Sequence, residues 1–219
     1  MKNKKKYLLV SLAGMLIPIL YISLIIILGA LQPGFNHMTM LLSNLGGVGG
    51  VRGDIFNIGV GITGGFIILF AFGLNRAVNQ SEAGLKRVFL FILGGLGLIG
   101  TAIFNCNQNC VIVLNLDPIR SLHGIFAFIA GLSLTLAPFP FYSHFKKDPE
   151  WEKLATFTLT IAILSTISTI LFWIMFVTNT LPNILGLIQR LQFLFVLIWI
   201  GVNSMVLLLA LNRNSIRLN

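Results

Sequence analysis

Long apolar runs separated by short polar gaps dominate this chain. A membrane-spanning helix needs about 20 consecutive, mostly apolar residues, and six segments meet that requirement. They cover residues 7–31, 55–78, 88–104, 122–145, 154–177 and 191–211. The pattern predicts an all-α polytopic membrane protein, in which residues 1–219 form a single domain, a bundle of six transmembrane helices.

The basic residues in the gaps predict the orientation. With the N-terminus inside, the inner segments contain twelve Lys and Arg residues, and the outer loops contain only Arg52, Arg120 and Arg190. Cytoplasmic loops carry the excess of positive charge, so we expect both termini in the cytoplasm. The first apolar run of 25 residues exceeds the 7–15 residues of a secretory signal core, and we expect it to be retained as a span.

Composition supports the same class. Only 10% of the residues are charged and 56% are hydrophobic, whereas a soluble domain has about 25% charged residues. The net charge of +9 is spread over the gaps, while a nucleic-acid-binding protein gathers its basic residues on one face. We therefore expect membrane lipids as partners, no nucleic acid, and a location in the plasma membrane of a prokaryote; the oligomeric state stays open.

Small residues that allow close helix approach recur on three spans: Gly61 and Gly65, then Gly94, Gly97 and Gly100, then Ala127 and Gly131. We expect them to mediate tight packing within one bundle, with the glycines of the second and third spans buried. Homodimerisation through Gly61 and Gly65 is the alternative.

Polar residues cluster in the outer segments and at the adjacent helix ends. Such loops often carry binding and catalytic groups, and ionisable groups at the membrane edge usually face the bundle interior or a wet cavity. We expect one polar, ligand-binding pocket at the outer membrane edge, formed by His37, Ser43, Asn44, Asp54, Asp117, Arg120, His123, Gln189 and Arg190. The alternatives are that the loop groups cap helix ends and that an Asp117–Arg120 pair sets helix depth.

Arg190 begins the sixth span, on the side where basic residues are scarce. Its guanidinium carries five donors in one plane, which suits two-point contact with a carboxylate or phosphate. We expect Arg190 to be at least half-buried and to pair with Asp54, with Asp117 or with a lipid phosphate. The alternative is an anchor that reaches the headgroups.

A polar stripe follows the sixth span and faces polar residues on the fifth. The sixth contributes Gln189, Gln192, Trp199 and Asn203, and the fifth Thr158, Ser165 and Thr169. The stripes predict either hydrogen bonds between helices or a track for a ligand.

The two cysteines, Cys106 and Cys110, lie on the predicted outer side, where disulfides persist. Four residues of helix separate α-carbons by about 6 Å, which suits a disulfide. We expect no metal and no cofactor. Catalytic motifs of hydrolases are absent from the sequence, although His37 and His123 are candidate general bases. No acidic residue lies mid-span, which disfavours ion-coupled transport.

Three groups of residues resemble an uncharacterised six-span membrane family, domain of unknown function 998. They are Pro33-Gly34, His37, Ser43 and Leu45-Gly46 after the first span, Leu122-His123-Gly124 on the fourth, and Gly186 to Leu191 with Trp199 on the sixth. More remotely, the first outer loop is similar to DRAM/Sfk-type membrane proteins, linked to lipid organisation and autophagy. Asn44 replaces an expected acidic residue and Asn105 a Pro-containing stretch, which weakens an acid–base role. The resemblance implies an architecture more than an activity.

Three classes of function remain open. The first is a lipid-binding or lipid-handling protein whose arginines hold an anionic headgroup. The second is an intramembrane lipid hydrolase or transferase with His37 or His123 as the base. The third is a structural or regulatory membrane component without a small-molecule ligand.

Overall fold

A computed structural model describes residues 2–78, 84–106 and 118–213. Over these residues the chain is all-α, as predicted, and six stretches are long and apolar enough to span a membrane. The helices are α1 (Lys2–Leu31), α2 (Ser43–Gly46), α3 (Gly50–Val78), α4 (Leu85–Ile103), α5 (Pro118–Leu136), α6 (Pro138–Phe145), α7 (Ala155–Thr178) and α8 (Leu185–Arg213), with short 3-10 turns at Glu152–Leu154 and Pro182–Ile184.

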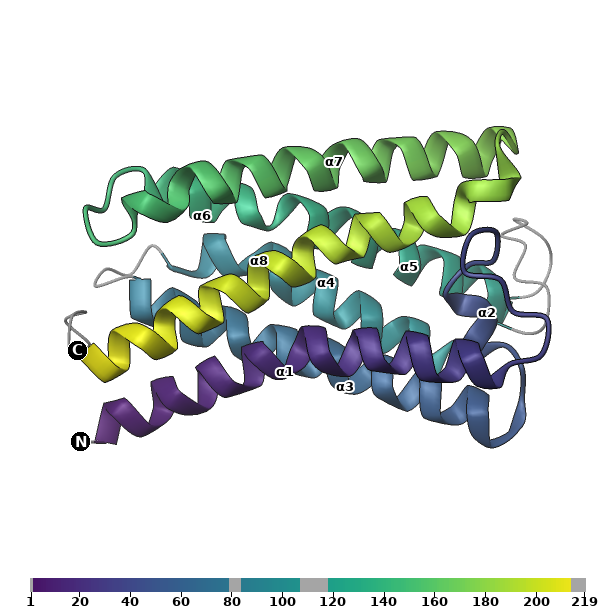
Figure 1. The fold of residues 1–219 in the computed structure, drawn as a ribbon, viewed down its shortest axis with the longest axis horizontal. Helices are drawn as coiled ribbons and strands as arrows, with labels where there is room; N and C mark the ends of the chain where they lie inside the picture. The colour runs from purple at the N-terminus through teal and green to yellow at the C-terminus, as the bar shows by residue number, and fades with distance from the viewer. Residues whose placement is uncertain (1, 79–83, 107–117, 214–219) are drawn as a thin grey trace.

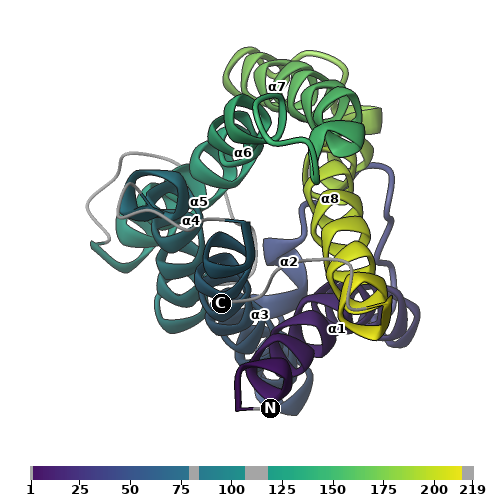
Figure 2. The same cartoon turned by 90° about the vertical axis from the view of Figure 1, so that its left-hand side faces the viewer.

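The spans form a closed ring in chain order. Each packs on the next one along the chain, and α8 returns to pack on α1 (Figure 2). The start of α1 and the end of α8 lie at the same end of the bundle, which also carries the loop between α6 and α7, whereas α2 lies at the opposite end (Figure 1). An even number of spans brings both chain ends to the same side.

Several helices, among them those of the second and last spans, begin earlier than the apolar runs predict. The second span begins at Gly50 in place of residue 55, and the last at Leu185 in place of residue 191. Helical backbone satisfies its own hydrogen bonds, so a helix can extend beyond the apolar run into the polar membrane edge. As a result, Arg52 and Arg190 lie inside helices.

The fourth span is not the single helix predicted over residues 122–145. It is divided at Ala137 into α5 and α6. Pro138 begins α6 and Pro140 follows it. Proline has no N–H for the preceding turn but fits the first turn of a helix, which explains the break.

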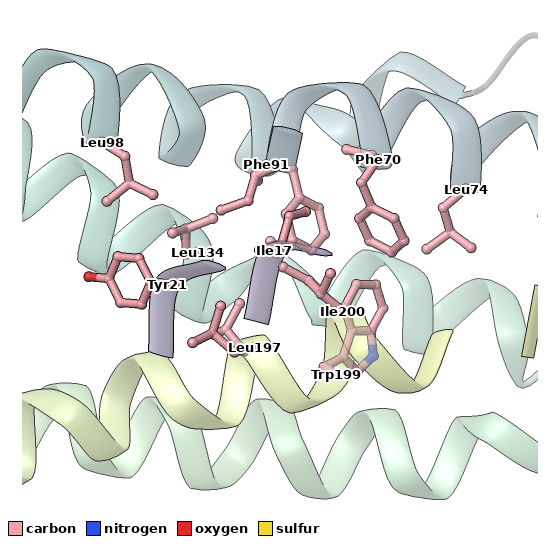
Figure 3. Close-up of a cluster of buried hydrophobic side chains, with 14 of the residues drawn as sticks. Ile17, Tyr21, Phe70, Leu74, Phe91, Leu98, Leu134, Leu197, Trp199 and Ile200 are labelled. Atoms are coloured by element: carbon pink, nitrogen blue, oxygen red, sulfur yellow. The ribbon is translucent and has the colours of Figure 1, made fainter. Parts of the chain in front are cut away.

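Trp199 of α8 occupies the centre of the bundle, completely buried. Its ring stacks on Phe91 at a centroid distance of 5.3 Å and meets Phe70 and Phe141 edge-on. Figure 3 shows this cluster. The indole N–H donates to Thr158 Oγ of α7 at 3.0 Å. One side chain thus connects α3, α4, α6, α7 and α8.

The tightest helix contact joins α3 and α4. A Cβ on Gly64 would lie 2.5 Å from the Gly95 carbonyl oxygen, and one on Gly95 would lie 2.6 Å from that of Gly64. Gly65, predicted for this role, has nothing within 4 Å, and Gly61 meets only Ala102 at 3.4 Å. The predicted small-residue face on this span was therefore wrong in its register.

The small residues of α4, which forms the third span, do pack as predicted. A Cβ on Gly97 would lie 2.7 Å from the backbone nitrogen of Ala130, and Gly94 and Gly100 abut Leu134 and Phe126. The missing side chains let the α4 and α5 backbones approach within the bundle.

Hydrogen bonds confirm the polar seam between the last two spans. Ser165 donates to the Gln192 carbonyl and to Thr135 Oγ, both at 3.3 Å. Thr135 and Thr169 hydroxyls lie 2.7 Å apart. The hydroxyls satisfy one another, which supports a structural role. Thr135 of α5, which the sequence did not indicate, extends the seam to a third helix.

Candidate functional site

The loop that follows α1, predicted to be the first outer loop, docks on the first turns of α8. The Leu187 N–H donates to the Met38 carbonyl at 3.0 Å. The Gln189 side-chain oxygen accepts the Leu42 N–H at 2.8 Å, and Arg190 Nη1 donates to the Met40 carbonyl at 2.9 Å. The first N–H groups of a helix have no partner within the helix, so the loop satisfies backbone groups that would otherwise be unpaired.

Gly186 makes this docking possible. It is buried, and a Cβ there would lie 2.4 Å from the Met40 carbonyl oxygen and 2.9 Å from that of His37. Only a residue without a side chain allows the loop backbone to come so close. The motif from Gly186 to Arg190 therefore joins the first loop to α8 at the α2 end of the bundle.

Arg190 is half-buried, as predicted, and uses only part of its hydrogen-bonding capacity. Nη1 donates to the Met40 and Gly186 carbonyls, and the guanidinium carbon lies 5.6 Å from the centre of the Phe35 ring. Nε and Nη2 are buried and have no hydrogen-bond partner among the described residues. These two nitrogens share one edge of the guanidinium, which can hold a carboxylate or phosphate at two points. Among the described residues, no group is hydrogen-bonded to this edge of Arg190.

Asp54, one of the three predicted partners of Arg190, lines a different space from Arg190. Asp54 is exposed and lines a separate hollow of about 670 Å³ between α3 and α4. No aspartate or glutamate among the described residues forms an ion pair with Arg190. Asp117 lies outside the described residues, as does the side chain of Arg120, so their predicted pairing stays a prediction.

Arg190 opens onto a groove between α1 and α8, about 290 Å³ in volume, which we call the α1–α8 groove. Its walls are almost entirely apolar: Tyr21, Ile22, Ile25, Ile26, Leu42, Leu187, Leu191, Phe193, Leu194 and Leu197. His37 lies beside Arg190 at the outer end. Burial lowers the pKa of His37 below its ordinary value of 6.5, and the charge of Arg190 lowers it further. His37 is therefore mainly neutral at pH 7, and Arg190 carries the positive charge of the groove.

A second space, the central cavity, lies inside the ring and has a volume of about 80 Å³. All six spans contribute to its lining, and its polar side chains are Tyr21, Ser43, Asn57, Thr101, His123, Trp173, Gln189 and Gln192. Tyr21, Leu42 and Phe193 line both this cavity and the α1–α8 groove. The two spaces are therefore neighbours with a shared wall.

His123 is buried in the wall of the central cavity. Its Nδ1 lies 2.7 Å from the Phe104 carbonyl oxygen. A carbonyl can only accept a hydrogen bond, so Nδ1 carries the proton and Nε2 of the neutral ring is an acceptor. The hydrogen bonds between described residues connect neither His123 nor His37 to a serine, threonine or cysteine. The activated nucleophile of a hydrolase is thus not assembled in this part of the chain.

The structure divides the predicted pocket into separate places. Ser43, His123 and Gln189 line the central cavity, His37 and Arg190 line the groove, and Asp54 lines the hollow between α3 and α4. Asn44, half-buried on α2, lines none of the three.

Four polar lining residues were not indicated by the sequence: Tyr21, Asn57, Thr101 and Trp173. A tyrosine, an asparagine and a tryptophan within apolar runs were the available signal, because each carries a polar group that needs a partner when buried.

Cys106 is buried and disulfide-bonded. The only other cysteine in the sequence is Cys110. It lies outside the described residues, so the geometry of the predicted pair is not described.

The six spans define the class: this is a polytopic α-helical integral membrane protein. The model of one protein family matches residues 15–206, and its description reads "Protein of unknown function (DUF998)". The match covers most of the chain, so the chain belongs to this family. Searches of the curated proteins and of the solved structures returned no match. The remote likeness to DRAM/Sfk-type proteins has no support from these comparisons.

Proposed function

We propose that this protein binds a phospholipid of the outer leaflet, with the phosphate on Arg190 and an acyl chain in the α1–α8 groove. The free edge of Arg190 carries this proposal. A buried N–H without a partner costs about 1–3 kcal/mol, and more on a charged group. Nε and Nη2 are two such groups on one edge, and a phosphate oxygen pair would satisfy both.

The groove suits the rest of a lipid. Its inner part is lined by Ile22, Ile25 and Ile26 of α1 and by Leu194 and Leu197 of α8. Ile26 is 58% exposed, so this wall faces the bilayer. An acyl chain can enter sideways from the membrane while the headgroup stays at the outer end.

Binding is favoured over hydrolysis by the surroundings of the two histidines. Nδ1 of His123 is occupied by the Phe104 carbonyl, and His37 packs edge-on against Phe35 with ring centres 5.0 Å apart. Neither is hydrogen-bonded to a nucleophile among the described residues. A purely structural role would leave the free edge of Arg190 without a purpose.

Replacing Arg190 by lysine should reduce retention of an anionic phospholipid about tenfold or more, because lysine keeps the charge but loses the two-point edge. We would reconstitute the protein in phosphatidylcholine nanodiscs containing either phosphatidic acid or diacylglycerol, and measure co-purified lipid by mass spectrometry. Wild type should enrich phosphatidic acid over diacylglycerol, and free glycerol phosphate should not displace it.

Arg52→Lys is the matched control, because Arg52 is an exposed arginine at the same end that donates to the Leu31 carbonyl. It should retain lipid like wild type. If Arg190→Lys retains phosphatidic acid as well as wild type does, Arg190 is only an interfacial anchor and the proposal is wrong.

The proposal requires the α2 end of the bundle to face outward, as the distribution of basic residues predicts. Lys4→Cys and Arg213→Cys, in a background with Cys106 and Cys110 replaced, should react with an impermeant maleimide only after cells are permeabilised. Asn36→Cys, on the exposed first outer loop, should react in intact cells. Labelling of Lys4→Cys in intact cells would show that the orientation is the opposite one, and the lipid could then not be assigned to the outer leaflet.

A further inference from the structure

Trp173 lines the central cavity and carries a donor that the described residues do not use. Its ring is held by Phe128, Phe172 and Phe176, with centroid distances of 5.1, 5.4 and 5.8 Å. Its indole nitrogen is buried and has no hydrogen-bond partner in the part of the chain that the structure describes. A tryptophan N–H in a buried position usually finds an acceptor. The rigid packing of the ring therefore holds a donor in the cavity wall for an acceptor from outside the chain.

Two further groups define what that acceptor can be. The Gln189 side-chain oxygen accepts the Leu42 N–H, so its amide NH₂ is the part left to donate. His123 uses Nδ1 on the Phe104 carbonyl and presents Nε2 as an acceptor. The cavity wall therefore contains both donors and an acceptor.

No Asp, Glu, Lys or Arg lines the central cavity, within the part of the chain that the structure describes. A phosphate or carboxylate placed there would lack a cation, and an ammonium would lack a carboxylate and meet the donors of Gln189 and Trp173. Burying an unpaired charge is costly. A hydroxyl group can accept from Trp173 and donate to His123, so an uncharged group bearing hydroxyls satisfies the wall.

The two spaces are adjacent at Tyr21. Tyr21 lines both the groove and the cavity, and its ring lies 6.0 Å from that of Phe193, which also lines both. A lipid phosphate held at Arg190 thus lies in a space that shares the wall of Tyr21, Leu42 and Phe193 with the central cavity. The cavity of about 80 Å³ has room for several waters or a small polar group.

We infer that the central cavity binds the uncharged polyol headgroup of the phospholipid whose phosphate Arg190 holds. The inference rests on the proposed function and names its ligand class: a glycerol-type headgroup is selected over a bare phosphate, an ethanolamine or a choline. Trp173, Gln189 and His123 make this selection by hydrogen bonding.

The test measures headgroup preference separately from lipid retention. Nanodiscs with equal amounts of phosphatidylglycerol, phosphatidic acid, phosphatidylethanolamine and phosphatidylcholine are exchanged with the protein, and bound lipid is identified by native mass spectrometry. Wild type should enrich phosphatidylglycerol several-fold over phosphatidic acid. Trp173→Phe, which keeps an aromatic ring and removes the N–H, should bring that ratio towards one while total anionic lipid is retained.

Two variants complete the design. His123→Asn keeps a donor for the Phe104 carbonyl and removes the Nε2 acceptor, so it should also lose the preference for phosphatidylglycerol. It provides a second test that does not depend on whether Trp173→Phe folds. Trp151→Phe, the same change at a buried ring stacked on Phe145 at the other end of the bundle, should keep it.

The outcomes separate the two proposals. The inference is overturned if wild type retains phosphatidic acid as well as phosphatidylglycerol, or if it selects choline or ethanolamine lipids. It is also overturned if Trp173→Phe and His123→Asn keep the preference for phosphatidylglycerol. If Arg190→Lys retains phosphatidic acid, the proposed function fails regardless of headgroup preference.

Discussion

Gly64→Ala is expected to destabilise the bundle strongly, whereas Gly65→Ala, one residue along the same helix, is expected to leave it unchanged or slightly more stable. A Cβ on Gly64 would lie 2.5 Å from the Gly95 carbonyl oxygen, which is backbone of a rigid helix and cannot rotate away. Overpacking of this kind costs about 1–3 kcal/mol. At Gly65 the space is open, and alanine favours helix over glycine by up to about 1 kcal/mol.

The measurement is the thermal unfolding temperature of the purified variants in one detergent, followed by circular dichroism or a thiol-independent fluorescence assay. Gly95→Ala should act like Gly64→Ala, because its Cβ would meet the Gly64 carbonyl. Equal unfolding temperatures for Gly64→Ala and Gly65→Ala would contradict the helix phase described for α3.

Gly186→Ala is expected to release the first outer loop from α8. Its Cβ would lie 2.4 Å from the Met40 carbonyl oxygen, so loop and helix must separate. The three docking hydrogen bonds at Leu187, Gln189 and Arg190 would then be lost or weakened. Each contributes about 1 kcal/mol net, and the one from the charged Arg190 about 1.5–3 kcal/mol, so a loss of a few kcal/mol is expected.

Limited proteolysis should show this directly, with faster cleavage between residues 32 and 42 in Gly186→Ala than in wild type, together with a lower unfolding temperature. Gly201→Ala is the matched control on the same helix, because its Cβ would make an ordinary contact with Pro18 at 3.5 Å. Unchanged cleavage of the loop in Gly186→Ala would mean that the docking described here does not hold the loop.

The candidate site was only partly predictable from the sequence. Arg190 and Gln189 were identifiable because a basic residue on the outer side and a polar residue at a span end are unusual in this chain. Their partners were not, because Met40 and Leu42 contribute backbone atoms and backbone atoms leave no trace in a side-chain pattern. The same limit applies to Asp54, one of the predicted partners of Arg190. A count of charges shows which carboxylates exist, but not that Asp54 lines the hollow between α3 and α4.

By itself, the sequence determined the class of protein and the number of its spans, because a helix needs about 20 mostly apolar residues to cross a bilayer and the chain contains six such runs. It also contained the cause of the break at Ala137, in Pro138 and Pro140. Only the tertiary structure decided between Gly64 and Gly65, divided the polar residues between the central cavity and the α1–α8 groove, and left one edge of Arg190 free. In lipid both sides of a helix are apolar, so hydrophobic periodicity does not reveal which face points inward. The face that points inward is determined by close backbone contacts and by buried hydrogen bonds between residues far apart in the chain.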